Sequence, residues 1–80
     1  MNFDKVSSDL NNKNVVAILD EQSDSFKKFG PRLVGKLVGR SKESRNNISK
    51  GVVSLTILAH DYLTYQIPCG EIKAISELFL

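Results

Sequence analysis

The stretch Gly30-Pro31-Arg32-Leu33-Val34-Gly35-Lys36-Leu37-Val38-Gly39-Arg40 holds three of the five glycines in this 80-residue chain. Read as a strand, it places Leu33 and Leu37 on one face with two glycines, and its basic side chains on the other face. Read as a helix, it stacks the same leucines four residues apart behind Pro31, but each interior glycine costs about 1 kcal/mol relative to alanine. The stretch therefore favours a strand, and its glycines favour a strongly bent one, as small barrels need.

The residues that follow predict a β-hairpin. Residues 51–59 alternate between two faces, which is the period-two pattern of a half-buried strand. His60-Asp61 is then typical of a tight turn, and residues 63–67 alternate again as a second strand. The polar residues 41–50 that precede this hairpin are expected to form a long exposed loop or one short helical turn.

The two ends of the chain predict further elements. Residues 3–10 carry apolar side chains at the spacing of one helical face, and Asn2 can cap that helix. Residues 15–19 are a β-branched run that is typical of a strand buried on both faces, and the acidic residues 20–25 are expected to form a loop. The tail, residues 71–80, fits either a helix or a strand, and periodicity alone leaves both open.

These elements fit one domain, residues 1–80. We expect a mainly β, small α+β fold, in which an N-terminal helix precedes about five strands of a bent small barrel. A chain this short buries only about 60% of its unfolded surface, so an isolated monomer is marginally stable. Oligomerisation is a common remedy, and we expect a homo-oligomer.

Charge is concentrated in the middle of the chain. Residues 27–50 hold eight of the eleven basic residues and one acidic residue, Glu43, so this segment carries a formal +7 against −3 before it and −2 after it. Lysine and arginine neutralise phosphates and release counterions, so the segment predicts an anion-binding surface. Its basic residues are Lys27, Lys28, Arg32, Lys36, Arg40, Lys42, Arg45 and Lys50. On a strand, Arg32, Lys36 and Arg40 would share one face; the alternative is a solvated set of charges that protects strand edges.

The other chemically distinctive side chains predict no catalysis. His60 and Asp61 have no second histidine or nucleophile at a meaningful spacing, and Cys69 has no partner histidine. Tyr62 and Tyr65 are candidate stacking platforms for unpaired bases, although strand spacing exposes at most one of them. We expect a protein that is not an enzyme and that needs no metal or other cofactor.

The sequence gives no sign of membrane insertion or export. Its longest apolar run, residues 52–59, is interrupted by two hydroxyl residues and is far shorter than the ~20 residues that span a bilayer. The N-terminus lacks a basic start followed by an apolar core, and a single cysteine excludes an intrachain disulfide. We therefore expect a cytoplasmic protein with no membrane partner.

The glycine spacing resembles the first motif of the Sm-like family, which includes the bacterial Hfq proteins. In residues 30–40 a glycine turn is followed by an apolar residue three positions later, a glycine two after that, and then a leucine. Asn47-Ile48 is similar to the Asn-Leu of that motif after a longer intervening loop. Residues 70–75 are similar to the second motif, one residue short.

This resemblance implies an SH3/Sm-like open barrel of five bent strands after a helix, assembled edge to edge in a ring that binds RNA. It adds Asn47 to the predicted binding residues. Cys69-Gly70 stands where the second motif has Arg-Gly, and the Tyr-Lys-His signature of Hfq is absent. The resemblance therefore does not carry the RNA site of the family over intact.

Three functions fit these observations. The first is a non-enzymatic module that binds single-stranded RNA or another polyanion through residues 27–50. The second is a phage- or mobile-element-type small protein that inhibits a larger host protein by covering an acidic surface or a nucleic-acid channel. The third is a structural subunit whose basic segment docks within a larger assembly.

Overall fold

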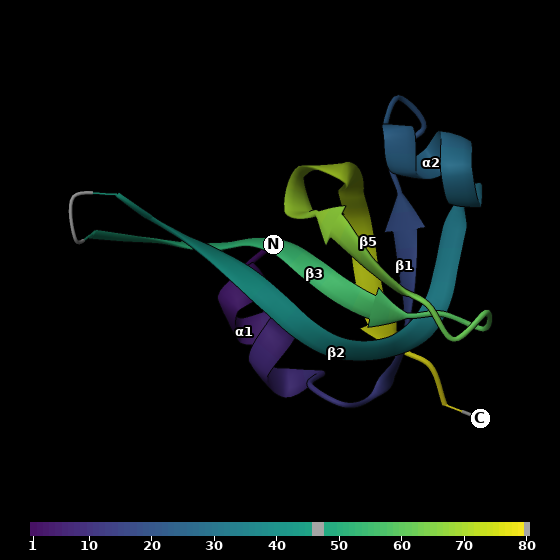
Figure 1. The fold of residues 1–80 in the computed structure, drawn as a ribbon, viewed down its shortest axis with the longest axis horizontal. Coiled ribbons are helices and arrows are strands. Elements are labelled where there is room, and N and C mark those ends of the chain that lie inside the picture. Colours follow the sequence, from purple (N-terminus) through teal and green to yellow (C-terminus); the bar gives the residue numbers. More distant parts are fainter. Residues whose placement is uncertain (46–47, 80) are drawn as a thin grey trace.

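A computed structural model describes residues 1–45 and 48–79, with side chains for residues 1–43 and 51–79. Within these residues, five strands form one antiparallel sheet accompanied by short helices (Figure 1). This confirms the predicted mainly β, small α+β fold and its N-terminal helix. In chain order the elements are α1 (Phe3–Asp9), β1 (Asn14–Leu19), α2 (Asp24–Phe29), β2 (Arg32–Arg45), β3 (Ile48–Leu58), β4 (Thr64–Pro68), the 3-10 helix η1 (Cys69–Glu71) and β5 (Ile72–Glu77).

The sheet is open and has the strand order β4-β3-β2-β1-β5. Its central strand is β2, which pairs with β1 over residues 32–36 and with β3 over residues 36–45. Within the described part of β2, Lys36 alone pairs with both neighbours, Asn14 of β1 and Leu58 of β3. The edge strands β4 and β5 follow one another through η1, and among the described residues no ladder joins them.

The strand β2 bends where its partner changes, and Figure 1 shows it curving past the end of β3. A Cβ atom built on Gly35 would lie 2.4 Å from the carbonyl oxygen of Leu58 and 2.6 Å from Cγ2 of Ile57, closer than real Cβ atoms approach. A Cβ on Gly39 would meet Thr56 at an ordinary 3.6 Å. The predicted glycine-dependent bend is therefore confirmed at Gly35, because a side chain there would push β2 away from β3.

One face of the bent sheet carries the core. Along β1 the buried residues alternate with Val16 and Ile18, which are only half-buried. The predicted strand is confirmed, but the prediction that it is buried on both faces holds for one face only. The buried apolar residues are Val15, Ala17, Leu19, Leu33, Leu37, Leu55, Ile57, Ile67, Cys69 and Ile72.

Both α-helices begin at a side-chain cap. Asn2 Oδ1 accepts hydrogen bonds from the first turn of α1, the shorter one from the N–H of Asp4 at 3.1 Å, which confirms the predicted helix and its cap. The expected loop over residues 20–25 is wrong at its end, because α2 begins there. Ser23 Oγ accepts a hydrogen bond from the N–H of Phe26 at 3.0 Å and so caps α2.

The described residues between 41 and 50 are strand, so the predicted loop or helical turn is wrong. The first half continues β2 and the second half begins β3, and the two leave the body as a two-stranded ribbon (Figure 1). We call residues 41–45 and 48–52 the hairpin arm. Its polar residues lack an apolar alternation because the ribbon has no core beneath most of its length, which removes the usual strand signal. Asn46 and Asn47 lie outside the described residues.

The predicted hairpin of β3 and β4 is confirmed. Ala59 closes its turn, since its N–H donates to the carbonyl oxygen of Leu63 (3.0 Å) and its carbonyl oxygen accepts from the N–H of Tyr62 (3.1 Å). The C-terminal tail, for which the sequence pattern allows either a helix or a strand, forms a strand. β5 pairs with β1, and the N–H of Leu78 donates to the carbonyl oxygen of Asn14 at 2.8 Å.

A bulge changes which way the side chains of β2 point. The ladder between β2 and β3 skips Val38, so Arg40 pairs with the buried Leu55 on the core face, whereas Lys36 lies on the outer face. The prediction that Arg32, Lys36 and Arg40 share one face is therefore wrong for Arg40. The physical cause is the inserted residue, which shifts the alternation of every residue that follows it.

We expect Gly35→Ala to lower the free energy of unfolding by about 3 kcal/mol, because its Cβ would overlap the backbone of β3. Gly39→Ala is the matched control, and its Cβ meets only the side chain of Thr56 at 3.6 Å. The control should change the stability by less than about 1 kcal/mol. Chemical denaturation measures both variants, and equal midpoints would contradict the close approach at Gly35.

Candidate functional site

The structure separates the predicted basic residues into three groups: one on α2, one on the outer face of β2 and one at the root of the hairpin arm. Their described members are, in that order, Lys27 and Lys28, Arg32 and Lys36, and Arg40 and Lys42. Arg45 and Lys50 belong to the arm by their backbone, and their side chains lie outside the described part of the chain, as does Asn47 entirely.

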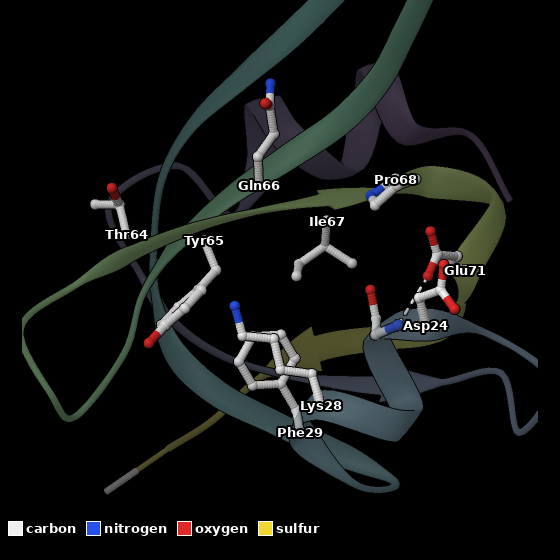
Figure 2. Close-up of a pocket in the computed structure, with 10 residues that line it drawn as sticks. Asp24, Lys28, Phe29, Thr64, Tyr65, Gln66, Ile67, Pro68 and Glu71 are labelled. Atoms are coloured by element: carbon white, nitrogen blue, oxygen red, sulfur yellow. Dashed lines mark hydrogen bonds between the residues drawn. The ribbon is translucent and has the colours of Figure 1, made fainter.

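Of the α2 group, Lys28 lines a pocket of about 350 Å³ between α2 and β4, together with the carboxylates of Asp24 and Glu71 (Figure 2). Lys27 forms an exposed ion pair with Asp24 (4.0 Å), of a kind worth about 0–1 kcal/mol. Glu71 lies at the end of the pocket, where its Oε1 accepts a hydrogen bond from the N–H of Ser25 at 2.9 Å. With carboxylates beside Lys28, this pocket is not a simple anion site.

Lys28 and Tyr65 belong to one aromatic cluster beside this pocket (Figure 2). The Nζ atom of Lys28 lies 4.6 Å from the centroid of the Tyr65 ring, which also meets Phe29 edge to face at 4.8 Å. The Tyr65 hydroxyl donates to the carboxylate of Asp61, and this bond lowers the pKa of Asp61 and raises the pKa of Tyr65. Tyr62, by contrast, is 89% exposed, which confirms that at most one of the two tyrosines is free of the core.

The second group lies on the outer face of β2. Arg32 and Lys36 are exposed, and the ion pairs found among the described residues do not include them. Lys36 borders a largely apolar cavity of about 290 Å³, and His60 and Tyr62 of the β3–β4 turn border it too. The β3–β4 turn, which borders this cavity, and the hairpin arm lie at opposite ends of the molecule (Figure 1).

The third group begins at the root of the arm, where Arg40 meets α1. Its guanidinium donates to Oγ of Ser7 at 3.1 Å, and Ser7 in turn donates to the carbonyl oxygen of Asp4. No ion pair among the described residues involves Arg40, so most of its five N–H donors stay available to an anion. A polar cavity of about 360 Å³ beside it is lined by Ser7, Ser8, Asn11, Gly39 and Arg40.

Asp4 also fixes the position of the arm. Its Oδ1 accepts a hydrogen bond from the N–H of Val52 at 3.0 Å, and a Cβ on Gly51 would lie 3.1 Å from its Oδ2. Sequence reasoning missed Asp4 and Ser7 as partners of the arm. The spacing of these polar residues on α1 is the same as on any solvent-exposed helix face. Their role follows from the position of the arm in the fold, which the sequence pattern does not show.

The cysteine has a structural position, and the described residues form no metal-binding cluster. Cys69 is buried in the core, as predicted, and burial, with a smaller effect of the Asp4 charge, raises the pKa of its thiol. A thiol with a raised pKa is a weak nucleophile at neutral pH. Within residues 1–45 and 48–79, no three His, Cys, Asp or Glu side chains gather as ligands of a metal ion would.

Comparison with known proteins found no family model, no curated relative and no solved structure that matches this chain. In the described part of the chain, no helix has the length and apolar character needed to cross a bilayer. The resemblance to the Sm-like family therefore stays a prediction, and the function has to be inferred from the residues themselves.

We expect Tyr65→Phe to raise the pKa of Asp61 toward its ordinary value of 3.8, because the hydroxyl is the largest cause of the lowered pKa. A carboxyl group with a lowered folded-state pKa stabilises the fold above its unfolded pKa, and this contribution disappears as the pH falls through the folded pKa. The variant should therefore lose less stability in acid than the wild type. Carboxyl-carbon NMR titration measures the pKa, Tyr62→Phe is the control, and an unchanged Asp61 pKa in Tyr65→Phe would contradict the assignment.

Proposed function

We propose that this chain is a small, non-enzymatic RNA-binding module that contacts the phosphate backbone through its hairpin arm. One observation carries the proposal: the arm projects from the body as a two-stranded ribbon (Figure 1), and residues 40–52 contain four basic residues and one acidic residue. A projecting ribbon can approach a polyanion from either face without a clash with the body of the protein.

The electrostatics of the arm root support this proposal. The ion pairs in the described part of the chain lie on other elements and include neither Arg40 nor Lys42. Because these cations have no carboxylate partner, binding to phosphate requires no ion pair to be broken. Each phosphate neutralised on a single strand contributes about 0.7 to the salt slope, so four contacts, from Arg40 and the three basic residues of the arm, give a slope of about −3.

The choice of RNA among polyanions is supported by the resemblance of residues 30–40 to the first Sm motif. The element order, a helix followed by five antiparallel strands with β2 bent at Gly35, agrees with that resemblance. We extend the proposal to the architecture and assign the bent sheet to the SH3/Sm-like small barrels. Cys69-Gly70 stands where the second Sm motif has Arg-Gly, so we assign the phosphate contact to the arm and not to the second motif.

We expect single-stranded RNA to bind with an affinity that falls steeply with salt, because counterion release supplies the main driving force. Lys42→Ala should reduce the magnitude of the slope of log K against log salt by about 0.7. Lys73→Ala, which removes an exposed charge from β5 far along the chain, is the matched control and should leave the slope unchanged. Fluorescence anisotropy of a labelled dodecauridylate at several salt concentrations measures both.

The absence of binding to oligonucleotides at low salt would overturn the RNA proposal. In that case a stoichiometric complex with one acidic host protein, recovered from native extract with no nucleic acid in it, would favour the inhibitor function. The same Lys42→Ala variant distinguishes the two, since in an inhibitor it weakens the protein complex and leaves nucleic-acid binding absent.

Both edge strands of the open sheet support self-association. β4 and β5 each pair with a partner on one side only within the described fold, and an unpaired strand edge is a template for another chain. We expect a homo-oligomer in solution, in which β4 of one copy lies beside β5 of the next. Light scattering at micromolar concentration measures the mass, and a monomeric mass across the concentration range would contradict this assembly.

A further inference from the structure

Tyr62 occupies a position in the β3–β4 turn that does not suit a tyrosine. Its φ of 63° lies in the left-handed region, which glycine and asparagine adopt at lower cost. The residue is 89% exposed, so its side chain adds little to the core. The turn itself is held by backbone hydrogen bonds of Ala59 and by the N–H of Leu63, which donates to Oδ1 of Asp61 at 3.0 Å. Folding therefore gives no reason for an aromatic side chain here, and strained residues of this kind gather at functional sites.

A cavity of about 290 Å³ adjoins Tyr62 on the outer face of the sheet. Its walls include the half-buried Val34 and Leu58, with Lys36, Asn14 and His60 at the polar positions. The described residues of the lining include no carboxylate, and so they do not favour a cationic ligand. Its volume lies near the lower end of ligand pockets, ~300 Å³, and fits one flat ring system.

Tyr65, in contrast to Tyr62, has its ring and hydroxyl engaged by neighbouring side chains. Tyr65 already has Lys28 above its ring, Phe29 against its edge and Asp61 on its hydroxyl. Tyr62 has no aromatic or cationic partner of this kind among the described residues. Its ring is thus available to stack on a ligand.

We propose that the cavity beside Tyr62 binds one unpaired nucleobase of an RNA strand. The base stacks on the Tyr62 ring above Val34 and Leu58, Asn14 and His60 supply polar contacts to its edge, and Lys36 meets the adjoining phosphate. This inference rests on the proposed RNA-binding function and adds a preference for single strands, because a base enters the cavity only when it is unpaired.

The test compares Tyr62→Gly with the wild type by anisotropy of a labelled dodecauridylate and of an abasic strand of the same length. Loss of one stacked base should weaken uridylate binding by about 5- to 150-fold, with no change in the salt slope because no charge is removed. The abasic strand should bind both proteins equally. Tyr62→Phe keeps the ring and should bind like the wild type, whereas Lys36→Ala should lower the magnitude of the salt slope by about 0.7.

Thermal unfolding provides the check on folding. Tyr62→Gly should melt a few degrees higher than the wild type, because it removes the left-handed strain. Equal uridylate affinity in wild type and Tyr62→Gly, or an equal loss for the abasic strand, overturns the base site and leaves the arm proposal standing. Absence of any RNA binding by the wild type overturns both.

Discussion

The rest of the structure depends on the close approach of two backbones at Gly35. β2 pairs with β1 before this point and with β3 after it, so both halves of the sheet meet where the Gly35 Cα lies against the Leu58 carbonyl oxygen and the Ile57 side chain. A residue with a Cβ would separate the halves and open the core between them. The bend lets the ten buried apolar side chains of the described residues, which come from all five strands and η1, enclose one core, which a flat sheet of this size could not do.

The strand β2 also determines where the positively charged side chains lie on the fold. Before the bulge at Val38, Arg32 and Lys36 point outward, with Lys36 beside the Tyr62 turn, and after the bulge Arg40 points toward α1. A segment with a formal +7 in sequence is therefore not one surface but separate positive regions at different places on the fold. Ser7 and Asp4 of α1 form hydrogen bonds with Arg40 and Val52 at the root of the arm, so α1 helps to set the direction in which the cationic ribbon leaves the body.

The periodicity of apolar residues in the sequence predicts much of this fold, and the elements that it does not predict have identifiable physical reasons. The first helix, the strand pattern of residues 32–40 and the hairpin after it are all local signals, and each is confirmed. The bulge at Val38 has no local signal, because the inserted residue is apolar like its neighbours and only pairing with β3 reveals it. α2 has only a weak local signal, the capping residue Ser23 followed by Asp24, and it is a single turn and a half preceded by acidic residues that resemble a loop. The residues proposed to bind a base come from β1, β2, the end of β3 and the β3–β4 turn, so no spacing in the sequence could group them.

Tyr62 shows how strain separates residues that serve the fold from residues that serve a ligand. A left-handed conformation costs a non-glycine residue about 1 kcal/mol, which is a sizeable part of the margin of an 80-residue domain. Gly51 adopts a similar φ of 86° beside Asp4, where the fold needs it and glycine removes the cost. At Tyr62 the left-handed conformation still destabilises the fold, and the exposed side chain adds little stability that could offset it. The contrast between the two positions favours binding at the Tyr62 turn, and it does not depend on the charge of the hairpin arm.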